Sequence, residues 1–318
     1  MRNLLLAVCL FFAGAVLYGQ EEAVVLQSSG KVQFLPAGNG KAQSVYPGTR
    51  LSINGKIKLP SGALARLLYN GATYPLKGGR TYLLSEVLNQ PAAGSGMSFT
   101  GRFWNFLSGS MKETQNEKQL VENHRRYMEA VRAGVKGFAE KDHPIRSGRH
   151  LEGKMSGGTV RFAWTGPKET RAFLFKIRSN PEEQEILSAW VRDSVFEVDL
   201  SQLALEPGEN YTWIVLTGAG KGEAARSVAH EFVFDPGAAE VMMTRLADNP
   251  EYRQAAPLEQ QLMKAFMLEE SEFFYEADRV YADAAKTFPG NALVRDTRAA
   301  FLSRMDRLDE AKTILQQK

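Results

Sequence analysis

The chain has 318 residues, of which 44% are hydrophobic and 24% are charged, a balance typical of a globular protein with two or three domains. Its 39 basic and 36 acidic residues give a net charge of +3, too small a surplus to indicate nucleic-acid binding. The one cysteine, Cys9, lies in a segment that we expect to be removed, which excludes disulfides, thiolate metal sites and cysteine nucleophiles from the mature chain. With only four histidines, we expect no metal site and no other cofactor.

Residues 1–19 have the pattern of a secretory signal peptide. Arg2 precedes an apolar run from Leu4 to Leu17, which is shorter than the roughly 20 residues of a membrane-spanning helix. The chain turns polar after Gly19, where we place the cleavage. We therefore expect a periplasmic or secreted protein, with an uncleaved membrane anchor as the alternative.

Residues 20–90 predict a small all-β module. Apolar segments alternate with glycine or Asn-Gly turns, of which Asn54-Gly55 and Asn70-Gly71 tolerate the positive φ angles of tight hairpins. The expected strands lie at 24–26, 32–34, 51–53, 57–59, 64–68 and 82–84.

The turns of this module follow a known order. The segments that carry it are Gly30-Lys31-Val32, Tyr46-Pro47-Gly48-Thr49-Arg50-Leu51, Gly55-Lys56-Ile57, Ser61-Gly62-Ala63-Leu64-Ala65-Arg66-Leu67 and Asn70-Gly71. The module resembles the FecR-like periplasmic domain. Founding members of that family relay a signal from an outer-membrane receptor to a cytoplasmic sigma factor, which requires a cytoplasmic arm. Because only three residues precede the apolar run, we expect the fold of that family but not its mechanism.

Residues 91–152 are predicted to form a linker with one amphipathic helix. The aromatic cluster at 102–107 needs a cover, which we expect to be a neighbouring domain; a membrane surface is the alternative. Apolar residues from Leu120 to Phe138 recur at three- and four-residue steps, which predicts a helix with one buried face. We interpret the opposite, largely basic face as solvated; a peripheral contact with acidic lipid or a partner is the alternative. His124 lies on the apolar face and is expected to be buried and hydrogen-bonded rather than a ligand.

Residues 153–236 predict a β-sandwich. Apolar residues alternate with polar or small ones at 160–164, 173–177, 196–200, 211–215 and 232–234, and 186–191 is a less regular strand. This number of strands in this length indicates an immunoglobulin-like or fibronectin-like fold.

The stretch from Leu205 to Trp213 reads Leu-Glu-Pro-Gly-Glu-Asn-Tyr-Thr-Trp. It resembles the fibronectin type III pattern L-x-P-G-x-x-Y-x-W. In that family the tyrosine, here Tyr211, bonds back to the chain across a corner, and an early tryptophan, matched here by Trp164, fills the core. The resemblance implies that these aromatic residues are core; a carbohydrate-stacking platform is the alternative.

Residues 237–318 repeat with a period of 34 residues. Ala265, Leu268, Ala277 and Tyr281 are matched by Ala299, Leu302, Ala311 and Leu315. Ala277, Tyr281, Ala284 and Pro289 fit the pattern A-x3-[FY]-x2-A-x4-P, so the region resembles tetratricopeptide repeats. Since about three units are needed for independent stability, we expect this short array to pack on the sandwich or on a partner.

Helix pairs of this kind stack into a concave face that can bind a peptide or a helix. We expect the first helix of each unit to line this face and to bind an acidic segment of a protein partner; alternatively, the helices only complete the fold by docking on the sandwich. The predicted contact residues are Gln261, Lys264, Arg295 and Arg298.

No catalytic motif with a specific spacing occurs in the sequence. We therefore interpret the protein as an exported, non-catalytic cell-envelope scaffold or protein-binding protein rather than an enzyme. The alternative is a cell-wall or glycan-acting enzyme or an accessory carbohydrate-binding protein. That alternative needs Asp142, His143 or the run Glu182–Glu185 to share a cleft with Trp190.

Overall fold

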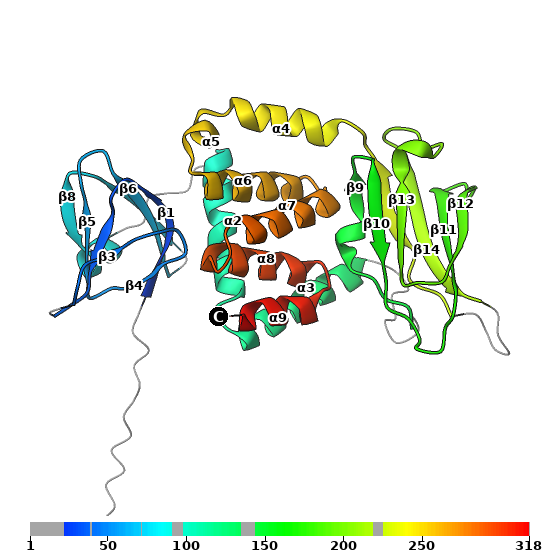
Figure 1. Cartoon of the computed structure of the whole chain (residues 1–318), viewed down its shortest axis with the longest axis horizontal. Helices are drawn as coiled ribbons and strands as arrows, with labels where there is room; N and C mark the ends of the chain where they lie inside the picture. The colour runs from blue at the N-terminus through cyan, green and yellow to red at the C-terminus, as the bar shows by residue number, and fades with distance from the viewer. Residues whose placement is uncertain are drawn as a thin grey trace, which may run out of the picture.

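The computed structural model describes residues 22–38, 40–70, 72–90, 98–134, 144–218 and 225–317. The chain combines β-rich parts with a helical C-terminal region, which confirms the predicted multidomain β plus α class at this coarse level. The helices lie in the middle, with a β structure on either side (Figure 1). The predicted signal peptide, residues 1–19, lies outside the described residues. Within the described ranges, no helix is long and apolar enough to cross a membrane.

The N-terminal β module contains two four-stranded sheets. Its strands are β1 (Glu22–Ser29), β2 (Gln33–Leu35), β3 (Gln43–Ser44), β4 (Arg50–Ser52), β5 (Lys56–Leu59), β6 (Leu64–Tyr69), β7 (Ala72–Lys77) and β8 (Arg80–Leu83). The strand orders are β4-β1-β6-β7 and β3-β2-β5-β8. Val25 and Leu67 of the first sheet and Ile57 of the second are fully buried in one core, which the short helix α1 (Leu84–Leu88) closes.

The two Asn-Gly turns of this module play different parts. Asn70, with φ of 47°, turns the chain between the paired strands β6 and β7, as a hairpin requires. Asn54-Gly55 also turns the chain, but the strands that it joins, β4 and β5, belong to different sheets. The expected hairpin at Asn54-Gly55 is therefore wrong. Glycine is needed at position 55 because a Cβ there would lie 2.3 Å from the Phe34 ring.

The sandwich comprises a five-stranded and a two-stranded sheet. Its strands are β9 (Gly153–Met155), β10 (Thr159–Ala163), β11 (Phe173–Asn180), β12 (Glu185–Val191), β13 (Val195–Asp199), β14 (Asn210–Thr217) and β15 (His230–Phe234). The strand orders are β12-β11-β14-β15-β9 and β10-β13. Between the sheets, the Phe162 ring packs against Phe175 at 4.9 Å and against Trp213 at 5.2 Å, measured between centroids. The alternating segments of the sequence thus form strands, as predicted; the unpredicted β9 adds a parallel edge to β15.

Tyr211 and Trp164 belong to the core of the sandwich, as the sequence predicts. The Tyr211 hydroxyl accepts a hydrogen bond from the Glu206 backbone amide at 2.7 Å, so the ring ties strand β14 to the turn before it. Trp164 is 4% exposed and packs edge-on against Phe173.

The helical region is larger than the sequence predicts. Its helices are α2 (Phe99–Glu113), α3 (Glu117–Gly134), α4 (Ala238–Asp248), α5 (Pro250–Gln254), α6 (Pro257–Glu270), α7 (Phe274–Thr287), α8 (Ala292–Arg304) and α9 (Leu308–Gln316). The pairs α6–α7 and α8–α9 pack as hairpins, and the alanines matched by the 34-residue period, Ala265, Ala277, Ala299 and Ala311, are fully buried. These features fit a helical repeat.

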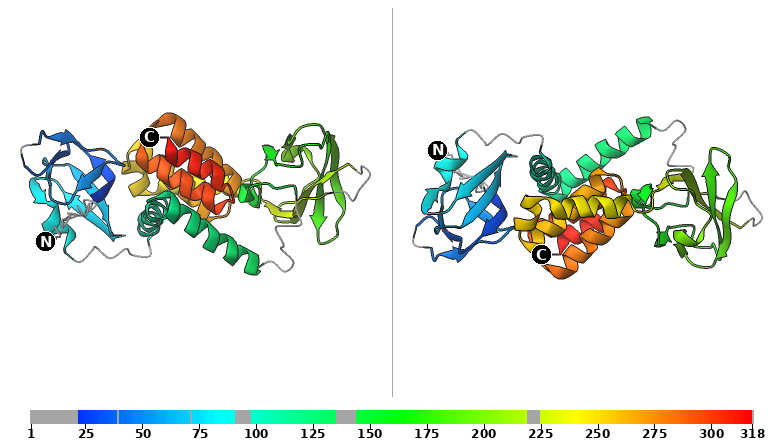
Figure 2. Two further views of the ribbon diagram at one scale, coloured as in Figure 1. Left: turned by 90° about the horizontal axis from the view of Figure 1, so that it is seen from below. Right: turned by 90° about the horizontal axis from the view of Figure 1, so that it is seen from above.

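The segment 91–152, predicted as a linker with one helix, holds both α2 and α3. Helix α2 packs against α6 and α8, and α3 packs against α8 and α9. Figure 2 shows the two helices along one side of the C-terminal helices. The aromatic cluster explains this packing, because Phe103 and Trp104 are buried in the same core as the C-terminal helices. The C-terminal helices are therefore the neighbouring domain that was expected to cover the cluster. Leu120 begins the buried face of α3, whereas Val135 and Phe138 lie outside the described residues.

Candidate functional site at the sandwich junction

The sandwich meets the helical region through residues 145–161, and we call this contact the sandwich junction. The Arg149 amide donates to the Met305 carbonyl at 2.9 Å, and the Lys154 amide donates to the Glu272 carbonyl at 2.8 Å. A cavity of about 440 Å³ opens here. Its wall combines apolar side chains with a small polar cluster, which makes it a candidate ligand site at a domain boundary.

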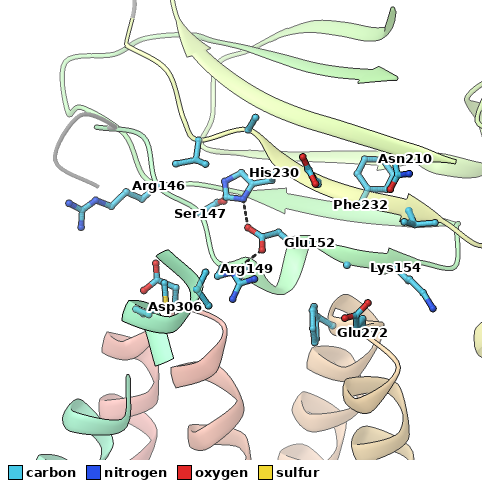
Figure 3. Close-up of a pocket in the computed structure, with 18 of the residues that line it drawn as sticks. Arg146, Ser147, Arg149, Glu152, Lys154, Asn210, His230, Phe232, Glu272 and Asp306 are labelled. Atoms are coloured by element: carbon cyan, nitrogen blue, oxygen red, sulfur yellow. Dashed lines mark hydrogen bonds and ion pairs between the residues drawn. The ribbon is translucent and has the colours of Figure 1, made fainter. Parts of the chain in front are cut away.

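Three polar side chains of this wall form a hydrogen-bonded chain. Ser147 Oγ lies 2.8 Å from His230 Nε2, and His230 Nδ1 lies 2.9 Å from Glu152 Oε1. Figure 3 shows the His230 ring and the Glu152 carboxylate directed toward one another. A carboxylate only accepts hydrogen bonds, so Nδ1 carries a proton; in the neutral ring the Nε2 lone pair then faces the Ser147 hydroxyl.

Strand pairing brings these residues together. β9 pairs in parallel with β15, with Phe232 opposite Gly153, so His230 at the start of β15 lies beside Glu152 just ahead of β9. Ser147 follows a short stretch that bridges to the sandwich on both sides, at Ile145 and Arg146. The His230 ring is held from behind by Trp213, stacked at 4.3 Å between centroids.

Glu152 is fixed by a second partner. Arg149 Nε donates to Glu152 Oε2 at 2.8 Å, so each carboxylate oxygen of Glu152 has its own hydrogen bond. Burial acts to raise the pKa of Glu152, but the hydrogen bond from His230, together with the charge and hydrogen bond of Arg149, holds that pKa below its ordinary value. The carboxylate is therefore ionised at neutral pH and able to orient the imidazole.

A second hollow of about 860 Å³ is also lined by Ser147. Ser147, Arg146 and Asp306 line both spaces. The second wall also contains His150, which is 9% exposed. Burial and the neighbouring Arg307 charge lower the pKa of His150 to about 4, so it is neutral at pH 7. Among the residues described by the structure, no group of three His, Cys, Asp or Glu side chains could hold a metal ion.

The four predicted partner-binding residues do not form one exposed face. Gln261, Lys264, Arg295 and Arg298 are all half-buried. Arg295 Nη2 is 2.7 Å from the buried Asp296 carboxylate, which also faces Arg50 of the β module at 3.5 Å.

The chain's own helix α2 covers a face of the first helices. The Phe266 ring of α6 lies 4.9 Å from Phe106 and 5.8 Å from Phe103, measured between centroids. Arg304 of α8 pairs with Glu113 at the end of α2, at 2.7 Å. The surface of α6 and α8 that carries Phe266 and Arg304 is thus occupied by α2.

The groups expected of a glycan enzyme do not converge where the structure describes them. Glu183 and Glu185 are exposed near the turn before β12 and pair with Arg178 and Lys176. Trp190 lies five residues after Glu185 on the same strand, which places it roughly 17 Å away, and it is 62% exposed. Asp142 and His143 fall outside the described residues.

Sequence reasoning did not single out Ser147, Glu152 or His230 as one site. The spacings of five and 78 residues match no catalytic motif, and only the β9–β15 pairing brings the three side chains together. Comparison of the chain with protein-family models and with curated proteins gave no match.

Proposed function

We propose that the protein is an exported scaffold of the cell envelope that binds a protein partner. In this proposal its parts are a FecR-like module, a fibronectin type III-like sandwich and tetratricopeptide-like helices. The observation that carries the proposal is the position of the helical region, which contacts one β structure at each end through Asp296 and Met305. Such an arrangement keeps two β modules at a set separation, which suits a protein that presents surfaces to a partner.

The finer resemblances have separate support. The hydrogen bond between the Glu206 amide and Tyr211 is the corner contact expected of a fibronectin-like sandwich. The buried alanines at the 34-residue period support the tetratricopeptide likeness. The two sheets of the N-terminal module are compatible with the FecR-like pattern of turn glycines.

Of the four predicted residues, which do not form one exposed face, we place the partner contact at Lys264 of α6 and Arg298 of α8. Lys264 and Arg298 are the cleaner positions to test, because Arg295 also serves the contact with the β module through Asp296. Deleting residues 250–318 would be a poor test, because it removes the helices on which α2 packs.

The experiment is photo-crosslinking in intact cells with the crosslinking residue at position 264 or 298. The matched control is position 126, on the solvent side of α3, where Arg126 is 67% exposed. If the scaffold proposal is right, a crosslinker at position 264 or 298 captures the same partner protein, and a crosslinker at position 126 captures none. With the crosslinker at 264, the additional substitution Arg298→Glu should abolish that capture. Equal capture at all three positions, or capture that Arg298→Glu leaves unchanged, would contradict the proposed surface.

One observation favours a second candidate, an accessory carbohydrate-binding protein. Trp190 is exposed on the edge strand β12, opposite the half-buried Leu174, where a flat apolar surface could stack on a sugar ring. Retention of the wild type on peptidoglycan, with loss in Trp190→Ala and no change in Val241→Ala (another exposed apolar residue, on α4), would support this candidate.

A further inference from the structure

We propose that Ser147, His230 and Glu152 form a hydrolytic triad that cleaves esters bound at the sandwich junction. The inference goes beyond the scaffold role and is opposite to our sequence-based expectation that the chain is not an enzyme. It rests on geometry alone. A nucleophile, a base and an orienting carboxylate lie within hydrogen-bond reach of one another in the order that nucleophilic catalysis requires.

The base is oriented on three sides. Glu152 holds Nδ1 at 2.9 Å, Trp213 stacks on the ring, and the Nε2 lone pair is left for the Ser147 hydroxyl. Glu152 in turn is fixed by Arg149 at 2.8 Å. His230 is 6% exposed, so few alternative rotamers are open to the ring. Such preorganisation separates a triad from a chance pair of polar side chains.

The reaction has two balanced halves. Ser147 Oγ attacks the ester carbonyl carbon while His230 Nε2 takes the hydroxyl proton; the intermediate collapses, the alkoxide leaves, and His230 returns that proton to it. Water then attacks the acyl-serine and gives a proton to His230, and the Ser147 oxygen leaves and recovers it. The sum is one ester and one water converted to one acid and one alcohol, with Glu152 acting as a positioning residue.

The two hollows that meet at Ser147 indicate the kind of ester. The 440 Å³ cavity has an apolar part of its wall, beside charged residues such as Lys154 and Glu272; the apolar part consists of Met128, Val131, Ile145, Val228, Phe232 and Phe274. The 860 Å³ hollow has Trp164 and Leu308 in its wall beside many charged residues, among them Arg161, Asp278, Arg279, Arg307, Asp309 and Glu310. We therefore assign the acyl side of the substrate to the first space and a polar alcohol to the second. Medium-chain acyl esters of polar alcohols fit this division.

The test uses a fluorophosphonate, which forms a covalent adduct only with an activated serine and releases fluoride. The purified chain from residue 20 onward is treated, and the adduct is located by peptide mass spectrometry. The expected result is one adduct, on Ser147, absent in Ser147→Ala. Ser201 is the matched internal control, because its hydroxyl donates to the Asp199 carboxylate, whereas the Ser147 hydroxyl contacts a histidine nitrogen.

The base and the positioning residue are tested by rate. His230→Gln should slow labelling at least about 100-fold. Glu152→Gln should also slow it, and Glu152→Asp should restore part of the rate, which a purely structural role would not do. Should His230→Gln fail to fold, the ratio of Ser147 to Ser201 labelling in the wild type replaces it, because the Ser147 hydroxyl contacts a histidine and the Ser201 hydroxyl contacts a carboxylate.

The ester class is tested with p-nitrophenyl substrates. Octanoate should be cleaved faster than acetate, by about 10-fold or more, since the apolar cavity binds the longer acyl chain. A folded wild type that labels Ser147 no faster than Ser201 overturns the triad. Labelling of purified Ser147 does not depend on whether a partner is captured in the crosslinking experiment. Each experiment can therefore contradict its own proposal, the triad or the scaffold role, without affecting the other.

Discussion

The two junctions of the helical region are built by different means. At the sandwich junction, backbone amides make much of the contact: Arg149 donates to the Met305 carbonyl, Lys154 to the Glu272 carbonyl and Ser156 to the Glu276 carboxylate. The contact with the β module, which we call the N-terminal junction, relies on side chains instead. Gln27 Nε2 donates to Glu259 Oε2 at 3.0 Å, and Arg50 Nη2 lies 3.5 Å from Asp296 Oδ2.

This difference bears on how each junction responds to change. The two amide-to-carbonyl hydrogen bonds carry no charge and order no additional side chain, while the Ser156 amide holds the Glu276 carboxylate. The N-terminal junction buries the carboxylates of Glu259 and Asp296, and burial raises the pKa of both groups in spite of nearby arginines. Arg66, which stacks on Trp104 at 4.7 Å, has a buried Nε without a hydrogen bond to any described residue. We therefore expect the N-terminal junction to open more readily, especially above neutral pH.

The largest effect should come from Arg304, because its loss disturbs the helical region that both junctions share. Its guanidinium pairs with Glu113 and with Glu269, each at 2.7 Å. Arg304→Ala leaves two carboxylates without their partner, and we expect the free energy of unfolding to fall by about 3–5 kcal/mol. Urea unfolding followed by circular dichroism measures it.

The control for Arg304→Ala is Arg125→Ala, which removes an exposed arginine that pairs with Glu122 on the surface of α3. That variant should unfold at nearly the same urea concentration as the wild type. If the two variants unfold at the same urea concentration, the ion pairs between α2 and the C-terminal helices contribute little to stability. The helical region would then not be the rigid body against which the two junctions are compared.

Glu259→Gln should sharpen the difference at the N-terminal junction. Burial raises the pKa of Glu259 to about 7, from an ordinary value of 4.5. The folded state therefore binds the proton more tightly, so this stabilisation is complete below pH 4.5 and is lost as the pH rises through 7. Glutamine resembles the protonated form of the glutamate side chain. The free energy of unfolding of the variant should therefore exceed that of the wild type by at most about 3 kcal/mol at pH 8. Urea titrations at pH 4.5 and 8 measure this gap, which should close at the lower pH; an equal gap at both would contradict it.

His150 gives the sandwich junction a pH dependence of opposite sign. Its pKa is lowered from 6.5 to about 4 by burial and by Arg307, against the opposing charges of Asp278 and Glu310; the nearby His230 also lowers it. The folded state therefore favours neutral His150, and the stabilisation present above pH 6.5 is lost as the pH falls through 4. The free energy of unfolding of the wild type should fall by at most about 3 kcal/mol over that pH range, and that of His150→Gln should fall by less. Equal acid losses in the two proteins, measured by urea unfolding, would assign the effect to other groups.

The sequence predicts the strands of the sandwich because one buried face imposes a period of two on segments such as 173–177 and 211–215. It misses α2, although the signal is present: Phe99, Phe103, Phe106 and Leu107 follow helical spacing, and the Ser98 side chain caps the first turn by accepting from the Gly101 amide. The aromatic cluster at 102–107 is shorter than the stretch over which a helical period can be recognised.

The candidate site could not be predicted in the same way. Ser147 and Glu152 lie in irregular backbone around a 3₁₀ turn, and His230 lies 78 residues after Glu152. Their proximity depends on a parallel pairing between β15 and the three-residue strand β9. No local pattern records which distant strand an edge strand joins, so the three side chains come together only in the fold.

Two glycines allow each junction to be opened with the same chemical change, with a smaller effect on stability. Gly48 has φ of +89°, and a Cβ there would lie 2.9 Å from the Leu293 amide nitrogen of α8. Gly153 has φ of +78°, and its Cβ would lie 2.4 Å from the Glu272 carbonyl oxygen. Alanine at either position should destabilise the protein by about 2 kcal/mol, through backbone strain and the clash together. Gly62→Ala and Gly208→Ala add strain without a clash and serve as controls.

Hydrogen exchange measured by mass spectrometry then separates the junctions. In Gly48→Ala the amides at the start of α8 should exchange faster, while those of the sandwich stay protected. In Gly153→Ala the nearest atom to the new Cβ is the Glu272 carbonyl oxygen, which belongs to the backbone and cannot move aside as a side chain can. Amide exchange should therefore rise in both β9 and the turn at Glu272. Because β9 also pairs with β15, the disturbance should extend to the backbone of His230. If Gly48→Ala instead exposes the sandwich, the two junctions are coupled through the helices, and the contrast between them does not hold.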